Sequence, residues 1–124
     1  MSKDKILITG AAGFLGSHVC SHLIAKGAKT IAVDDLSGGF LSNIPPEAKW
    51  VQGDITDQEF VRTIWRKYGP FDQIYHLAAY AAEGLSHFIR RYNYTNNLIG
   101  SVNLLNEAVI HGCKCFVFSS SIAV

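Results

Sequence analysis

Three glycines spaced three residues apart, Gly10, Gly13 and Gly16, follow a short apolar run and precede a helical pattern. Residues 6–9 read Ile-Leu-Ile-Thr, which is typical of a strand buried on both faces of a parallel sheet. In such a unit the first glycine makes the tight turn, and the second lets a pyrophosphate approach the backbone. The third lets the helix pack closely on the strand. The spacing therefore predicts a phosphate-binding turn at a helix N-terminus, where free N–H groups attract anions.

A carboxylate stands at the end of the next predicted strand. A helix over residues 14–26 ends at Gly27, and residues 30–33 form a second buried strand. Asp34 follows this strand directly, where a dinucleotide-binding fold holds the adenosine ribose with a carboxylate. The alternative is that Asp34 only begins a turn beside Asp35. Asp34 is preferred over Asp35 as the ribose ligand because it directly follows the last strand residue.

The loop after this strand favours one cofactor over another. Residues 35–40 are polar and glycine-rich, and we expect them to wrap the adenosine side of the cofactor. Asp34 would repel a 2′-phosphate, and the loop contains no Arg or Lys to receive one. The sequence therefore predicts NAD rather than NADP.

Strand-like and helix-like segments alternate along the whole chain. A helix with Thr56 or Asp57 as its N-cap ends at Gly69, and a longer helical pattern runs to His111, followed by Gly112. The apolar residues in register on the longer helix are Leu98, Val102, Leu105 and Val109. The remaining strands are predicted over residues 49–53, 73–79 and 115–118.

This alternation predicts a Rossmann-type doubly wound α/β fold, with a parallel sheet of five strands in the order 3-2-1-4-5. Its switch point lies between the first and fourth strands, where ligands bind at the carboxyl ends. The pattern stops before a sixth strand. We therefore expect residues 1–124 to form one dinucleotide-binding domain that is incomplete and has no substrate domain.

Small and polar residues follow the later strands. Asp54 either caps its own loop or accepts a hydrogen bond from the adenine amino group, with Ile55 packing nearby. Ala78 and Ala79 leave space for the nicotinamide ribose at the end of the fourth strand. The last strand leads into residues 119–121, three serines.

Composition excludes several other functions. The net charge is +1 and no basic cluster is longer than Arg90-Arg91, so neither nucleic acid nor a membrane is an expected partner. Residues 1–4 lack an apolar signal segment, and a cytoplasmic protein is expected. No metal site is expected, because Cys113 and Cys115 are too closely spaced for the usual ligand pair and no second pair exists.

Several motifs agree in order and spacing with those of one known family. They are Thr9 to Gly16, Asp34 to Gly39, Gly53 to Ile55, His76 to Ala79, Asn96 to Ser101 and Phe118 to Ser121. On these motifs the sequence resembles the extended short-chain dehydrogenase/reductases, specifically the nucleotide-sugar epimerases and dehydratases. The resemblance implies a tightly bound NAD. With the glycines and loop above, the expected cofactor-binding residues are Gly10, Gly13, Phe14, Leu15, Gly16, Asp34, Asp35, Leu36, Ser37, Gly38, Asp54, Ile55, Leu77, Ala78, Ala79, Tyr80 and Asn96.

The resemblance also implies a mechanism. Ser121 would be the catalytic hydroxyl, bonded to the sugar oxygen that gains or loses a proton, while hydride moves between a sugar carbon and NAD. The family's acid/base is the Tyr of a Tyr-x-x-x-Lys motif, and none of the five tyrosines here has Lys four residues later. We therefore expect the amino-terminal portion of a longer NAD-dependent epimerase, inactive by itself.

The expected substrate of the full-length enzyme is a nucleotide sugar, UDP-linked. The dehydratase branch carries Asp-Glu after its serine or threonine, where this chain has Ile122-Ala123, so epimerisation is favoured over dehydration. Reduction and decarboxylation stay open. The resemblance further implies a homodimer as a candidate assembly, through helices that include residues 93–111.

Two other functions remain as alternatives. The chain could be a stand-alone NAD-binding or redox-sensing module without catalysis. It could also be an assembly module, because residues 115–118 would form an edge strand that invites pairing with another chain.

Overall fold

The computed structural model describes residues 4–78 and 94–119 of the chain. Its centre is a five-stranded parallel sheet in the order β3-β2-β1-β4-β5, which confirms the predicted order. The strands are β1 (Lys5–Thr9), β2 (Lys29–Asp34), β3 (Lys49–Gln52), β4 (Gln73–His76) and β5 (Cys115–Phe118). The helices are α1 (Phe14–Ala25), α2 (Gln58–Tyr68) and α5 (Gly100–Ile110), with a 3₁₀ turn at Leu41–Asn43 and a π-helical turn at Tyr94–Ile99.

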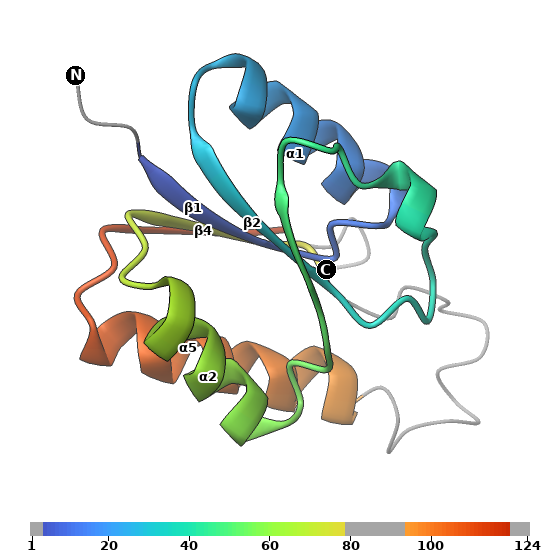
Figure 1. The fold of residues 1–124 in the computed structure, drawn as a ribbon. Coiled ribbons are helices and arrows are strands. Elements are labelled where there is room, and N and C mark those ends of the chain that lie inside the picture. The colour runs from blue at the N-terminus through green and yellow to red at the C-terminus, as the bar shows by residue number, and fades with distance from the viewer. Residues whose placement is uncertain (1–3, 79–93, 120–124) are drawn as a thin grey trace.

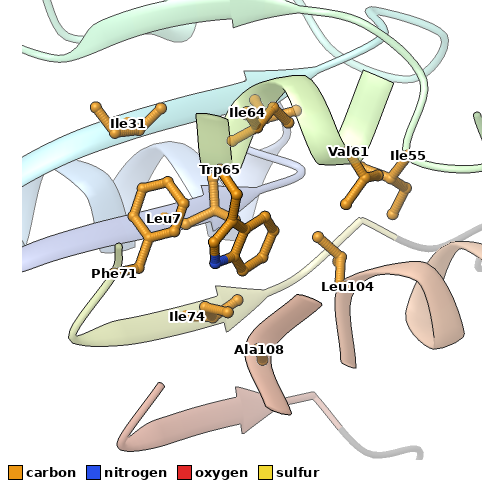
Figure 2. Close-up of a cluster of buried hydrophobic side chains, with 11 residues drawn as sticks. Leu7, Ile31, Ile55, Val61, Ile64, Trp65, Phe71, Ile74, Leu104 and Ala108 are labelled. Carbon is orange, nitrogen blue, oxygen red and sulfur yellow. The ribbon is translucent and has the colours of Figure 1, made fainter. Parts of the chain in front are cut away.

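Helices cover both faces of this sheet, with α1 on one side and α2 and α5 on the other (Figure 1). The side chains of β1 alternate between two cores. Ile6 and Ile8 pack with Cys20 of α1, whereas Leu7 belongs to the cluster around Trp65 of α2 (Figure 2). The unbroken apolar run in β1 follows from this arrangement, because neither face of the strand meets water.

The ends of α1 and α2 follow local rules. Gly13 is the N-cap of α1, and Gly27 follows its C-terminus with φ of 91°. The N-cap of α2 is Asp57 rather than Thr56, because the Asp57 carboxylate accepts from the N–H groups of Glu59 and Phe60. Among the described residues no helix is long and apolar enough to cross a membrane.

The buried face of α5 is not the apolar stripe seen in the sequence. The residues that α5 buries are Gly100, Asn103, Leu104, Glu107 and Ala108. The stripe in register, Leu98, Val102, Leu105 and Val109, is between 40% and 79% exposed. On the buried face Leu104 and Ala108 join the core cluster around Trp65, and the Asn103 side-chain amide donates to the carbonyl oxygen of Ile55 at 2.8 Å.

Candidate functional site

A pocket of about 200 Å³ lies at the carboxyl ends of the strands. It spans the switch point, because β1 and β4 are neighbours in the sheet and both end at this pocket. Its lining residues are Thr9, Gly10, Gly13, Val33, Asp34, Asp35, Ser37, Gly38, Gly53, Asp54, Ile55, Leu77 and Ala78. The predicted position of the ligand site in the fold is therefore a real concavity.

The three glycines of the first turn have different neighbours. Gly10 has φ of 71°, and a Cβ there would lie 2.7 Å from the backbone nitrogen of Ala78. A Cβ on Gly16 would collide with the carbonyl of Gly10, so the close packing expected of Gly16 is made between α1 and the turn itself. At Gly13 the nearest protein atom would be 3.4 Å away, which is an ordinary contact. A side chain at Gly13 would therefore meet no protein neighbour closely and would instead compete with a ligand at the N-terminus of α1.

Asp34 is held by backbone groups from two sides. Its Oδ2 accepts from the N–H of Ala12 at 2.9 Å, and its Oδ1 accepts from the N–H of Leu36 at 2.8 Å. Leu36 has φ of 66°, a left-handed conformation that costs a non-glycine residue roughly 1–2 kcal/mol. The hydrogen bond to Asp34 offsets part of this cost and sets the direction of the loop that follows.

Ala12 also anchors that loop through its carbonyl oxygen. The oxygen accepts from the backbone N–H of Phe40 at 3.2 Å and from the side-chain amide of Asn43 at 2.9 Å. Gly39 allows this approach, because a Cβ there would collide with the Ala12 carbonyl. Residues 35–43 are thereby fastened to the glycine turn, and the pocket lies between them.

Two further carboxylates line the pocket and cap their own loops. Asp35 Oδ1 accepts from the N–H of Ser37 at 2.9 Å and from its hydroxyl at 2.7 Å. Asp54 Oδ1 accepts from the N–H of Thr56 at 2.9 Å, so the capping role expected of Asp54 is present. The lining of this pocket contains three carboxylates and neither Lys nor Arg. These carboxylates repel a phosphate group and so disfavour a ligand that would place one beside them, at the ends of β2 and β3.

Most, though not all, of the expected cofactor residues come together here. The expected residues that line the pocket are Gly10, Gly13, Asp34, Asp35, Ser37, Gly38, Asp54, Ile55, Leu77 and Ala78. Those described but outside its lining are Phe14, Leu15, Gly16 and Leu36. Asn96 lies in the π-helical turn. Ala79, Tyr80 and Ser121 lie outside the described residues.

Three lining residues, Thr9, Val33 and Gly53, were not among the expected cofactor-binding residues, although Thr9 and Gly53 belong to the motifs quoted above. Each lies within the last two positions of its strand or directly after it. The rule that ligands lie at the carboxyl ends of the strands, applied to every strand, would have found them. Within residues 4–78 and 94–119, no three His, Cys, Asp or Glu side chains are grouped so that they could hold a metal ion.

Comparison with known proteins places the site in context. The model of the NAD dependent epimerase/dehydratase family matches residues 6–124. The chain is similar to UDP-glucose 4-epimerases of Streptomyces lividans, with 37% identity over 96% of this chain and 36% of that protein, and of Streptococcus mutans, with 37% identity over 95% and 36%. It thus spans little more than a third of the length of these relatives.

Solved structures of UDP-glucose 4-epimerases are also similar to this chain. A UDP-glucose 4-epimerase of Thermotoga maritima with UDP-glucose has a TM-score of 0.91 and 38% identity, covering 94% of this chain and 38% of that one. A UDP-glucose 4-epimerase of Thermus thermophilus in complex with NAD has a TM-score of 0.90 and 32% identity, covering 94% and 37%.

Proposed function

This chain belongs to the NAD dependent epimerase/dehydratase family, and we propose that its pocket binds the adenosine and pyrophosphate parts of NAD. The observation that carries the proposal is the Asp34 carboxylate, which lines the pocket and is fixed by two backbone N–H groups. A carboxylate has about four acceptor positions, so Asp34 can also accept from the two ribose hydroxyls. The complex of the Thermus thermophilus relative with NAD supports this ligand.

The rest of the pocket fits the other parts of NAD. The first turn of α1, which has no side-chain cap, offers backbone N–H groups to the pyrophosphate, and Gly13 places no side chain in the way. Asp54 accepts from the adenine amino group while Ile55 packs against the ring. Leu77 and Ala78 lie beside the nicotinamide ribose. The remaining proposed contacts are Phe14, Leu15, Asp35, Leu36, Ser37, Gly38, Ala79, Tyr80 and Asn96.

We further propose that residues 1–124 are the NAD-binding portion of a nucleotide-sugar epimerase with a UDP-linked substrate. Names of the relatives support this substrate class. When bound, NAD supplies the acceptor for a hydride from a sugar carbon. Ser121 is the proposed hydroxyl partner of the sugar oxygen. Because these 124 residues contain no Tyr-x-x-x-Lys motif, we expect no turnover of UDP-galactose or UDP-glucose by this chain alone.

A second candidate is a module that binds NAD without catalysis, because the same pocket would serve it. The two functions share the NAD site and differ in the reaction. The exposed apolar stripe of α5 supports a homodimer in either case, with a second copy of this chain as the partner.

Calorimetric titration with NAD tests the shared site. We expect Asp34→Ala to weaken binding by at least about tenfold, because two charge-assisted hydrogen bonds to the ribose are lost. Glu47→Ala is the control, since it removes an exposed carboxylate that does not line the pocket. Equal affinity in wild type and Asp34→Ala would remove the ribose assignment.

A further inference from the structure

Thr9, His76 and Ser101 form a hydrogen-bond network beside the pocket, called here the His76 network. Thr9 Oγ1 lies 2.7 Å from His76 Nδ1, and His76 Nε2 lies 2.8 Å from Ser101 Oγ. The three residues come from β1, β4 and α5, so the His76 network joins the two strands of the switch point to a helix. His76 is only 3% exposed, and its ring contacts those of Phe116 and Phe118.

The directions of the hydrogen bonds in this network follow from the contact of Ser101 with Asn97 together with a neutral His76 ring. Ser101 donates its single hydroxyl hydrogen to the carbonyl oxygen of Asn97 at 2.6 Å. Ser101 Oγ must then accept from His76, so the ring hydrogen is on Nε2, and Nδ1 accepts from the hydroxyl of Thr9. This arrangement requires a neutral ring. Burial keeps it neutral, because it lowers the pKa of His76 to about 4 from its ordinary 6.5.

At the Thr9 end the His76 network reaches the pocket. Thr9 Oγ1 accepts from the backbone N–H groups of Leu77 and Ala78, each at 3.2 Å. Thr9, Leu77 and Ala78 all line the pocket, and Gly10 packs directly on the backbone of Leu77 and Ala78. The N–H of Leu77 also donates to the carbonyl oxygen of Thr9 at 3.2 Å, so the Thr9 hydroxyl shares in holding Leu77 and additionally holds Ala78.

At the Ser101 end the His76 network reaches the helical turn that leads into α5. Asn97, whose carbonyl oxygen receives the Ser101 hydroxyl, belongs to the π-helical turn Tyr94–Ile99. This turn also contains Asn96, a proposed cofactor contact. The hydrogen bonds from Thr9 to Asn97 thus link two parts of the proposed NAD site that lie on different elements.

We propose that His76 is a positioning residue for the cofactor pocket. Its neutral ring, with the hydrogen on Nε2, holds the wall of Thr9, Leu77 and Ala78 in a set position relative to the turn Tyr94–Ile99. Packing alone does not require a histidine here, because removing an imidazole from water costs free energy that an apolar ring would not lose. The inference rests on the proposed NAD binding.

Ser101→Ala tests the His76 network at a residue outside the pocket, since Ser101 is not part of the pocket lining. In calorimetric titration with NAD we expect affinity to fall by about three- to tenfold, as for the loss of one hydrogen bond. Ser101→Thr keeps the hydroxyl and should restore affinity. The matched control is Thr63→Ala, which deletes the same kind of bond in α2, from Thr63 Oγ1 to the Glu59 carbonyl at 2.9 Å. Its NAD affinity should equal that of wild type.

Nitrogen NMR of the His76 ring gives a readout that a loss of stability would not mimic. We expect wild type to show a protonated Nε2 and a bare Nδ1, and Ser101→Ala to show both tautomers. A protonated Nδ1 in wild type would overturn the hydrogen-bond directions inferred for the His76 network. Equal NAD affinity of wild type and Ser101→Ala would overturn the positioning role and leave NAD binding intact.

A pair of variants at His76 repeats the test if Ser101→Ala does not fold. His76→Asn can keep an acceptor for the Thr9 hydroxyl, whereas His76→Phe removes both hydrogen bonds. We expect His76→Asn to bind NAD several-fold more tightly than His76→Phe, and equal affinities would contradict the inference. Failure of the wild-type chain to bind NAD would overturn the proposed function, and the role of His76 with it.

Discussion

The backbone N–H of Ala12 donates to Oδ2 of Asp34 at 2.9 Å, which ties the glycine turn to the end of β2. Asp34 therefore has a structural task besides its proposed contact with the ribose. The carbonyl oxygen of the same Ala12 holds Phe40 and Asn43. The backbone of one residue, Ala12, thus connects the phosphate side and the adenosine side of the proposed site, and we expect a change at either side to affect the other.

Discrimination between NAD and NADP should depend on Asp34. A 2′-phosphate near this carboxylate meets a repulsion on the order of a few kcal/mol, so we expect wild type to bind NAD at least about tenfold more tightly than NADP. Asp34→Asn removes the charge but keeps an acceptor for Leu36, and it should narrow the ratio. Calorimetry with both dinucleotides measures it. An unchanged ratio in Asp34→Asn would contradict the electrostatic explanation.

Gly16→Ala should destabilise the fold although alanine is the better helix former. In an exposed helix interior this change stabilises by about 1 kcal/mol. Here the new Cβ would collide with the carbonyl of Gly10, and relieving such overpacking costs about 1–3 kcal/mol or more. Urea denaturation measures the difference. Gly38→Ala is the control, because a Cβ at Gly38 would meet nothing within 4 Å. A Gly16→Ala variant as stable as wild type would show that the turn can yield.

Stability should rise with pH between about 4 and 6.5 because of His76. Burial lowers the pKa of His76 to about 4 in the folded chain, whereas the unfolded chain takes up this proton near the ordinary value of 6.5. In this window the unfolded state binds more protons, so acid favours unfolding. From about pH 7.5 to about pH 5 the loss from His76 is about 2 kcal/mol.

Comparison of wild type with His76→Asn by urea denaturation at these two pH values isolates the contribution of His76. The variant lacks the titrating group and should lose less stability in acid. The same acid sensitivity in both proteins would assign the effect to other groups.

Self-association should depend on the exposed stripe of α5. We expect the chain to sediment as a dimer, with Val102→Asp and Val109→Asp shifting it to monomer, because a carboxylate in an apolar interface is costly to desolvate. Ser21→Asp adds the same charge to an exposed position of α1, on the other face of the sheet, and serves as the control. A wild-type monomer at high concentration would remove the homodimer proposal.

Elements whose signals are local were predictable. The strand before the glycines, the tight turn at Gly10 and the capping of α2 each depend on residues within a few positions. The strand order also followed, since few topologies satisfy five alternating strand and helix units. Because parallel strands end at one edge of the sheet, Asp34 and Asp54 were expected near the same ligand, and both line the pocket.

Local sequence patterns were enough to predict the main strands and helices, their order and the edge of the sheet where the pocket lies, because periodicity, glycine geometry and strand handedness act over short distances. Long-range packing determines that α5 buries Asn103 and Glu107 and exposes its apolar stripe. It also decided that Ala12 meets Asp34, and that Thr9 meets His76 from 67 residues away. Those outcomes depend on which backbone groups of distant segments need partners, and no local pattern encodes that need.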